Sequence, residues 1–169
     1  VSGNKIHQGF KEEVDKIYPL VENLVDKITK GKKIWATGHS LGGAMATILA
    51  QRLEFTGGHD VDTLYTFGSP RAGGPQFRAW CDKHLNHQRF VNNNDVVPCL
   101  PTWVRYRHTG DNYYITSTGE ITRLGRWSSA RVRDKGWSLL KTILKGRLDL
   151  VADHNIKEYI RHLSNDNQN

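Results

Sequence analysis

The fold is decided by one stretch, Ile34 to Leu53, which reads IWATGHSLGGAMATILAQRL. Its first four residues are apolar or β-branched, as in a short buried strand, and the residues from Ala44 onward are small and apolar, as in a buried helix. Between them lies Gly38-His39-Ser40-Leu41-Gly42, which fits the G-x-S-x-G pattern of a sharp strand-to-helix turn. Glycine is expected two positions before and two positions after the serine, where a side chain would collide with neighbouring backbone. The pattern predicts that Ser40 is a nucleophile at the N-terminus of a helix, whose positive end favours developing negative charge. The alternative is a glycine-rich turn in which the serine has no catalytic role.

Working outward from this turn, predicted strands and helices alternate along the chain. Before it, apolar residues recur at helical steps of three and four; they are Phe10, Val14, Ile17, Val21, Leu24 and Ile28. After it, the patterns predict strands over 62–67 and 89–91, a helix over 75–85, an extended run over 104–108, a hairpin of 113–116 with 120–123, and a final helix over 155–163. This alternation predicts an α/β fold with a parallel sheet covered on both faces. We expect a single domain over residues 1–163, followed by a flexible tail over 164–169.

A serine hydroxyl is a weak nucleophile until a base removes its proton, and that base needs an acid to orient it. In folds with this turn the chain order is serine, then acid, then histidine. Asp95 follows the predicted third strand, at the edge where the active-site loops of open α/β sheets gather, and is our candidate acid. His154 lies just before the last helix, where a loop could present it to Ser40, but His108 is a competitor and position alone leaves the choice open. His39, the middle residue of the turn, is expected to point elsewhere.

Five motifs occur in order over roughly residues 6–160, nearly the whole chain. They are Ile6-His7-Gln8-Gly9-Phe10; Thr37 to Ala44 (TGHSLGGA); Thr66 to Gly73 (TFGSPRAG); Asn94 to Pro98 (NDVVP) with Leu100-Pro101; and Asp153 to Tyr159 (DHNIKEY). In these motifs the sequence resembles the class 3 (fungal-type) lipase family of the α/β-hydrolase superfamily. The resemblance implies that Ser40 is the nucleophile, Asp95 the triad acid and His154 the base, and that the backbone amide of Leu41 helps to hold the oxyanion.

By the same resemblance, the chain is expected to hydrolyse carboxylic esters through an acyl-enzyme, as a triacylglycerol lipase or a related lipid esterase. Other activities on the same fold stay open: a phospholipase A1, a galactolipase, a feruloyl esterase or a thioesterase. A degenerate hydrolase that only binds lipids or anionic surfaces is a further alternative. His7, the Pro70-Arg71 turn and Tyr159 match family positions that are mainly structural.

The chain departs from the family pattern at its start. Family members carry additional strands, and a loop with the second oxyanion donor, ahead of the motif at His7, whereas this chain has six residues there. We therefore expect a sheet that lacks its N-terminal strands and has an open edge. Only the Leu41 amide is assigned as an oxyanion donor, and loss of one donor costs about 10²- to 10³-fold in rate. Three expectations stay open: an upstream segment completes the oxyanion hole, a second chain completes it, or the activity is impaired.

The net charge of +7 is concentrated in one segment of the chain. From Arg123 to Arg147 there are eight basic residues and one acid, Asp134, so the rest of the chain is close to neutral. Because this segment also carries an apolar stripe, it would suit contact with an anionic lipid surface. An ordinary helix whose charges face water is the alternative. No nucleic-acid-binding motif accompanies the charge, so no nucleic-acid partner is expected.

The cysteines and the apolar runs of the sequence bear on possible cofactors and on the location of the protein. Cys81 and Cys99 have no metal-ligand spacing around them, and either two free thiols or a single bridge stays open. We expect neither a metal nor an organic cofactor. No apolar run approaches the roughly 20 residues needed to cross a bilayer, and no signal peptide is visible. Localisation, whether secreted or cytoplasmic, stays open.

Overall fold

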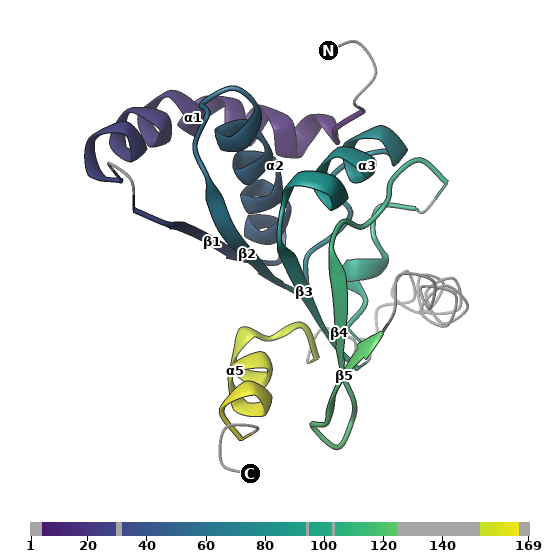
Figure 1. The fold of residues 1–169 in the computed structure, drawn as a ribbon. Coiled ribbons are helices and arrows are strands. Elements are labelled where there is room, and N and C mark those ends of the chain that lie inside the picture. Colours follow the sequence, from purple (N-terminus) through teal and green to yellow (C-terminus); the bar gives the residue numbers. More distant parts are fainter. Residues whose placement is uncertain (1–4, 30–31, 94, 103, 125–152, 166–169) are drawn as a thin grey trace.

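A five-stranded sheet with helices on both sides forms the centre of the molecule (Figure 1). The computed structural model describes residues 5–29, 32–93, 95–102, 104–124 and 153–165. The strands lie side by side in chain order: β1 (Ile34–His39), β2 (Val61–Phe67), β3 (His87–Asn92), β4 (Asp111–Ile115) and β5 (Ile121–Leu124). β1 to β4 run parallel, and β5 is antiparallel to β4. The predicted α/β fold with a mostly parallel sheet is therefore confirmed, and β1 is an edge strand among the described residues.

The helices lie on the two sides of this sheet. α1 (Gln8–Ile28), α2 (Leu41–Phe55) and α3 (Pro75–His84) lie together on one side, and α5 (Ile156–Asn165) lies on the other (Figure 1). A short 3-10 turn, η1 (Val97–Cys99), follows β3. α5 ends at Asn165, two residues after the approximate end predicted for the last helix, and residues 166–169 of the predicted tail lie outside the described residues. Polar residues are common in a last helical turn, and composition therefore marks a helix end poorly.

The apolar core lies between α2 and the sheet. α2 packs on β1 and β2, and α1 packs on the outer side of α2. Small residues allow α2 to approach closely: Ala44 and Ala50 are fully buried, and a Cβ atom on Gly43 would lie 2.7 Å from the Cβ atom of Ser69. Leu64 of β2 is fully buried against this layer. Each large apolar side chain buried here stabilises the fold by about 1.5–3 kcal/mol.

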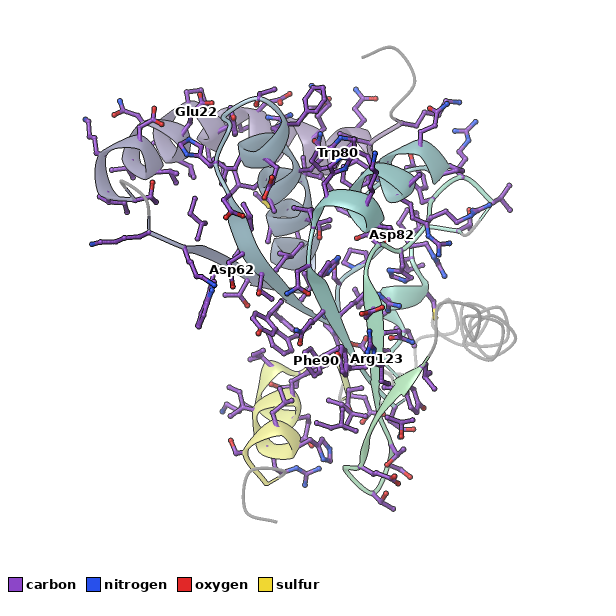
Figure 2. The ribbon with its side chains drawn as sticks, viewed as in Figure 1. Glu22, Asp62, Trp80, Asp82, Phe90 and Arg123 are labelled. Carbon is purple, nitrogen blue, oxygen red and sulfur yellow. The ribbon has the colours of Figure 1, made fainter. Side chains whose placement is uncertain are left out.

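An aromatic row crosses the opposite face of the sheet. The strand register aligns His39, Phe67, Phe90 and Tyr113 on four neighbouring strands. The ring centroids of Phe67 and Phe90 are 5.2 Å apart and those of Phe90 and Tyr113 are 5.0 Å apart, both stacked (Phe90 is labelled in Figure 2). Tyr159 of α5 packs edge-on against Phe67, with the centroids 6.1 Å apart. This contact brings the start of α5 to the carboxyl ends of β1 and β2.

Only some of the apolar residues of α1 are buried. Val14 and Val25 are buried, but Ile17, Leu24 and Ile28 are 39%, 48% and 64% exposed. α1 forms a second layer outside α2, so that only the residues facing α2 are covered. The helical spacing therefore predicted α1 correctly, but it did not predict which of the apolar residues are covered.

The segment expected to be extended over 104–108 was also predicted incorrectly. It begins with a turn at Val104 and Arg105, and only Arg107 pairs with another segment, in an isolated antiparallel bridge to Gly73. Alternating apolar and polar residues resemble a strand pattern, but a strand forms only where a partner strand is available. The predicted hairpin is confirmed, because β4 and β5 pair across the turn that contains Gly119.

Most of the basic segment from Arg123 to Arg147 lies outside the described residues. Arg123 itself lies in β5, is exposed, and forms an ion pair with Asp111 of β4. None of the described helices is both long and apolar enough to span a bilayer.

Candidate active site

The turn between β1 and α2 holds Ser40 in a rare backbone conformation. Ser40 has φ 57° and ψ −130°, a region that residues with side chains seldom adopt and that costs on the order of 1–3 kcal/mol. Its backbone N–H donates to the carbonyl of Phe67 at 3.0 Å, which ties the turn to β2. A Cβ atom on Gly38 would overlap the carbonyl oxygen of Gly42, so the chain can turn this sharply only with glycine at position 38. The sharp strand-to-helix turn expected from the sequence is present.

The second glycine of the motif has a different role from the one expected. A Cβ atom on Gly42 would meet no other atom within 4 Å, so packing does not require glycine there. The close approach on that side belongs to Gly43, which faces Ser69. The expectation that both motif glycines prevent a collision was therefore wrong for Gly42, which points outward in the first turn of α2.

The structure brings Ser40, His154 and Asp95 into one hydrogen-bonded line. The Nε2 atom of His154 lies 2.7 Å from the Oγ atom of Ser40. The Nδ1 atom of the same ring lies 2.9 Å from Oδ2 and 3.1 Å from Oδ1 of Asp95. Because a carboxylate only accepts hydrogen bonds, Nδ1 carries the proton, and Nε2 is left as the acceptor for the serine O–H. This is the arrangement in which an imidazole can act as a base towards a serine.

The carboxylate of Asp95 is buried and held by other donors. The hydroxyl of Tyr159 donates to Oδ2 at 2.6 Å, and the backbone N–H of Val97, at the start of η1, donates to Oδ1 at 2.9 Å. Burial, together with the neighbouring Asp95 carboxylate, raises the pKa of Tyr159, so the phenol remains a donor at all ordinary pH values. Two fixed donors restrict the carboxylate to the orientation that faces His154.

The loop that carries His154 is attached to the sheet at two points. His39 Nε2–H donates to the backbone carbonyl of His154 at 2.8 Å, and Asn92 Nδ2 donates to the carbonyl of Asp153 at 3.0 Å. Directly after this loop, the side chain of Asn155 accepts the N–H of Lys157 at 3.0 Å and so caps the start of α5. His39 therefore points towards the candidate base, which corrects the expectation that it points elsewhere.

Gly68, at the end of β2, makes room for the buried pair. It has φ +58°, and a Cβ atom there would lie 2.6 Å from Oδ2 of Asp95 and 3.0 Å from Nδ1 of His154. Sequence reasoning did not single out Gly68, Asn92 or His39 as parts of the site, and it treated Tyr159 as structural. Their only signal in the sequence is that each lies within or beside one of the five motifs.

The competing histidine does not reach the serine. His108 is half-buried, and its Nε2 atom lies 2.6 Å from the carbonyl oxygen of Pro98, which accepts its N–H. Burial holds the pKa of His108 well below its usual value, so the ring stays neutral. Leu41, the expected oxyanion donor, is the first residue of α2, where backbone N–H groups have no carbonyl of a preceding turn to bind.

The cysteines and other metal-binding residue types form no separate centre in the described residues. Cys81 is buried and Cys99 half-buried, and both are free thiols. Burial raises the pKa of each thiol. Within the same residues, no group of three or more His, Cys, Asp or Glu side chains is placed to hold a metal ion.

Known proteins are similar to this chain in sequence and in fold. A family model described as Lipase (class 3) matches residues 1–105. The chain is 36% identical to a lipase of Rhizomucor miehei over 131 residues, which is 72% of this chain and 36% of that protein. It is also 36% identical to secreted mono- and diacylglycerol lipase 1 of Fusarium solani over 120 residues, which is 68% of this chain and 35% of that protein.

Solved structures agree with these matches. A mutant of the protein MDLA from Penicillium cyclopium superposes with a TM-score of 0.70 at 28% identity, over 76% of this chain and 52% of that one. A triacylglycerol lipase whose catalytic centre is a serine protease triad superposes with a TM-score of 0.68 at 31% identity, over 78% of this chain and 56% of that one. The chain spans only about a third of the length of the Rhizomucor miehei and Fusarium solani lipases named above. From the family match, the motifs and the fold together, this chain belongs to the class 3 lipase family.

Proposed function

We propose that this chain is a carboxylic ester hydrolase that acts on lipid esters, with Ser40 as nucleophile, His154 as base and Asp95 as the acid that orients it. The observation that supports this most directly is the 2.7 Å separation of Ser40 Oγ and His154 Nε2, with Asp95 on the other ring nitrogen. A buried hydrogen bond to Asp95 fixes the ring so that its free lone pair faces the serine.

In the proposed reaction, Ser40 Oγ attacks the ester carbonyl while His154 Nε2 takes the hydroxyl proton. The carbonyl oxygen becomes an oxyanion that accepts a hydrogen bond from the Leu41 amide at the positive end of α2. The intermediate collapses, the C–O bond to the alcohol breaks, and the alcohol leaves with the proton from His154. Water then attacks the acyl-enzyme, gives its proton to His154, and releases the carboxylic acid as Ser40 regains its hydrogen.

The proposed substrates are acylglycerols, because the matched relatives are named as lipases, mono- and diacylglycerol lipases or a triacylglycerol lipase. A phospholipase A1, galactolipase, feruloyl esterase or thioesterase remains the alternative on the same site. Rates on mono-, di- and triacylglycerols of equal chain length, measured beside a phospholipid, a galactolipid and a feruloyl ester, distinguish these classes. We also propose, from its basic residues and its apolar stripe, that the segment from Arg123 to Arg147 contacts anionic lipid surfaces.

The decisive experiment is covalent labelling by an active-site fluorophosphonate, followed by peptide mapping. We expect the label on Ser40, and we expect Ser40→Ala to remove it and to lower turnover by on the order of 10⁴- to 10⁶-fold. Ser117→Ala, an exposed serine in the turn between β4 and β5, is the matched control and should keep full labelling. Unchanged labelling of Ser40→Ala would eliminate Ser40 as nucleophile, and no labelling of either protein would favour a non-catalytic lipid binder.

The second oxyanion donor is tested by the same label. We propose that it comes from an upstream segment or from a second chain. Labelling of the 169-residue chain alone should then be slow, and it should accelerate about 10²- to 10³-fold when the missing donor is supplied. Equal rates with and without a longer N-terminal segment, at all protein concentrations, would show that the chain needs no such donor.

A further inference from the structure

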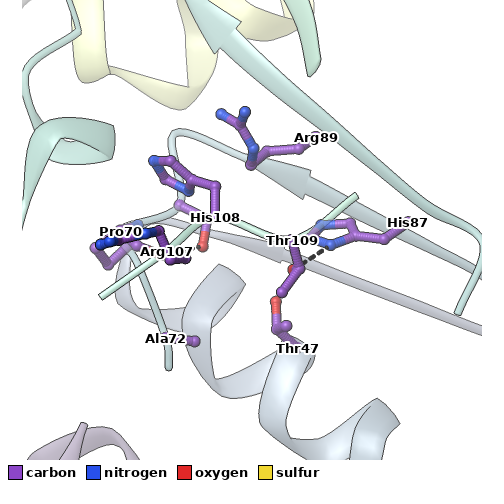
Figure 3. Close-up of a pocket in the computed structure, with 9 residues that line it drawn as sticks. Thr47, Pro70, Ala72, His87, Arg89, Arg107, His108 and Thr109 are labelled. Carbon is purple, nitrogen blue, oxygen red and sulfur yellow. Dashed lines mark hydrogen bonds between the residues drawn. The ribbon is translucent and has the colours of Figure 1, made fainter. Parts of the chain in front are cut away.

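The interior cavity shown in Figure 3 lies between β3, α2 and the segment before β4. Its volume is about 10 Å³, which is the lower limit for a single water molecule. Two of the polar groups around it are already paired, because His87 Nδ1 lies 2.8 Å from Thr109 Oγ1. This cavity therefore takes at most one water molecule and offers no room for a larger ligand.

The free edge of β1 is a different kind of feature, because it lies on the surface. Among the described residues β1 pairs only with β2, so its other side carries backbone N–H and C=O groups without a strand partner (Figure 1). Such an edge is a template for pairing with another strand, and proteins usually block it with charged residues or proline. β1 (IWATGH) contains neither proline nor any Asp, Glu, Lys or Arg residue. Its register with β2 shifts only between Ile34 and Trp35, at its first residue.

Trp35 and Thr37 carry the outward-pointing backbone groups of this edge. The N–H of Ser40 donates to the carbonyl of Phe67 in β2, and along a strand the N–H and C=O groups alternate between the two sides. The N–H and C=O groups of Thr37 and Trp35 therefore point away from β2. Both side chains are exposed, and the alternation of the strand places them on the same face of the sheet.

Trp35 is 70% exposed, more than any other large apolar side chain of the described residues. Its indole N–H donates to Oδ2 of Asp62 at 2.9 Å, and Asp62 also forms an ion pair with Lys33 at 2.5 Å. The ring is therefore held in one orientation although most of its surface is in water. Tryptophan is enriched in protein interfaces, because it contributes a large contact area at a small cost in conformational entropy.

A row of apolar side chains on α1 extends this surface. Leu20, Leu24 and Ile28 are 65%, 48% and 64% exposed, and their spacing of four residues places them on one face of the helix. Only residues 29–33 separate Ile28 from β1, and the C-terminal end of α1 lies at the end of the sheet away from β5 (Figure 1). Single exposed apolar residues are common, but several in one row are typical of an interaction site.

β1 is complementary to a second copy of itself in antiparallel orientation. With Ala36 opposite Ala36 of the second copy, Trp35 lies opposite Thr37 of that copy, and by symmetry the same pair forms twice. Each pair then exchanges hydrogen bonds through the outward N–H and C=O groups of both residues. An aromatic ring opposite a β-branched residue stabilises a strand pair by about 0.2–1 kcal/mol, and no like charges meet within the two strands. Because the two-fold axis is perpendicular to the sheet, the two α1 helices lie on the same side of it.

We propose that the free edge of β1 is the interface of a symmetric homodimer, in which two copies of β1 form one continuous sheet and Trp35 packs across the axis. A two-fold contact satisfies the open edges of both copies at once, so no further copy adds there. Stable interfaces bury roughly 1,200–2,000 Å² in total, which is more than one strand pair buries, and the exposed row on α1 provides additional apolar surface. The dimer does not depend on the ester hydrolysis proposed for Ser40.

Sedimentation equilibrium of the full chain over a range of protein concentrations tests the dimer. We expect twice the 19.2 kDa mass of one chain, falling to the mass of one chain on dilution. Trp35→Lys places a charge in the strand pair and should weaken the dimer by about ten-fold or more. Phe55→Lys removes an exposed aromatic ring that packs on Trp80 of α3, and it should leave the dimer unchanged. Circular dichroism and Tm check that each variant folds.

A disulfide across the two-fold axis tests the register. In this pairing Ala36 and its copy form a non-hydrogen-bonded pair, with Cα atoms about 4.5 Å apart, which a disulfide can span. Ala36→Cys should therefore give a disulfide-linked dimer on mild oxidation. Thr122→Cys, at an exposed position of β5 at the opposite end of the sheet, should not. The unmodified protein, with Cys81 buried and Cys99 half-buried, should also stay free of cross-links.

The mass of one chain at every concentration would overturn the proposal. A dimer that Trp35→Lys does not weaken and Ala36→Cys does not cross-link would place the contact on another surface and overturn it as well. A chain with a longer N-terminal segment that stays monomeric, and that Ala36→Cys does not cross-link, would assign the β1 edge to that segment instead of a second copy. Should Trp35→Lys fail to fold, the Ala36→Cys cross-link decides alone.

Discussion

His39 Nε2 lies 2.8 Å from the backbone carbonyl oxygen of His154, and the two imidazole rings stack with centroids 4.6 Å apart at 28°. The residue directly before the candidate nucleophile therefore holds the residue that supplies the candidate base. Because His39 ends β1 and precedes Ser40, any shift of the loop at His154 relative to the serine must break this hydrogen bond.

We expect substitution of His39 to lower kcat more than it changes KM. His39→Phe keeps the stacked ring but removes the donor, and a displacement of His154 by a fraction of an ångström should reduce kcat by roughly 10- to 100-fold. His39→Gln keeps an N–H donor and should retain more activity. Steady-state kinetics on one soluble ester check this, with His84→Gln, an exposed histidine of α3, as the control. Equal kcat values for His39→Phe and the control would show that His39 has no positioning role.

Tyr159→Phe should cost stability as well as activity. The phenol donates to Asp95 Oδ2 and accepts the backbone N–H of Asn92 at 3.0 Å, so its removal leaves a buried carboxylate and a buried amide each short of one partner. Each buried polar group left without a hydrogen-bond partner lowers the free energy of unfolding by about 1–3 kcal/mol. Urea denaturation of the variant should show this loss. Tyr65→Phe, whose hydroxyl makes no hydrogen bond in the described residues, should change the unfolding free energy by less than about 0.5 kcal/mol.

The two glycines of the turn should respond differently to alanine. Gly38→Ala should abolish fluorophosphonate labelling, because its Cβ atom would overlap the Gly42 carbonyl and the turn at Ser40 could not form. Gly42→Ala should keep labelling and stabilise the protein by about 0.4–1 kcal/mol, because Gly42 lies in a helix with free space around it. Labelling and Tm of both variants test this pair. Loss of labelling in Gly42→Ala would mean that the second glycine serves the reaction itself.

Buried neutral histidines should make the protein less stable in mild acid. The pKa of His87 is about 3 in the folded state because of burial, against about 6.5 for an unfolded histidine. The unfolded chain therefore binds the proton first as the pH falls, and stability is lost from about pH 6.5 downwards until about pH 3. Each such histidine contributes a slope of up to about 1.4 kcal/mol per pH unit, and His108 acts in the same direction.

Urea denaturation between pH 6.5 and pH 5 measures this slope before carboxylates begin to titrate. His87→Gln replaces the ring by an amide that can still hydrogen-bond to Thr66 and Thr109, and it should flatten the dependence of stability on pH. His84→Gln should leave this dependence unchanged. The same slope in all three proteins would mean that His87 does not contribute to the acid sensitivity.

Local patterns in the sequence were sufficient for most of the fold. The turn at Ser40, the helix after it and the hairpin of β4 and β5 follow from residues that are neighbours in the chain, because periodicity and glycine placement act over a few residues. The spacing of the apolar residues in α1 predicted a helix, but it did not predict which of these residues are buried. Ile17 and Leu24 share the helical spacing of Val14, and only the packing of α1 on α2 separates exposed from buried positions.

The sequence by itself determined the α/β fold, the family motifs and the order in which Ser40, Asp95 and His154 occur. Only the tertiary structure decided that His154, and not His108, reaches Ser40, a residue 114 positions away. The same holds for the support from His39, Tyr159 and Gly68. The physical reason is that turns and helices depend on contacts between near neighbours, whereas a hydrogen bond between distant residues depends on how the whole sheet and α5 pack together.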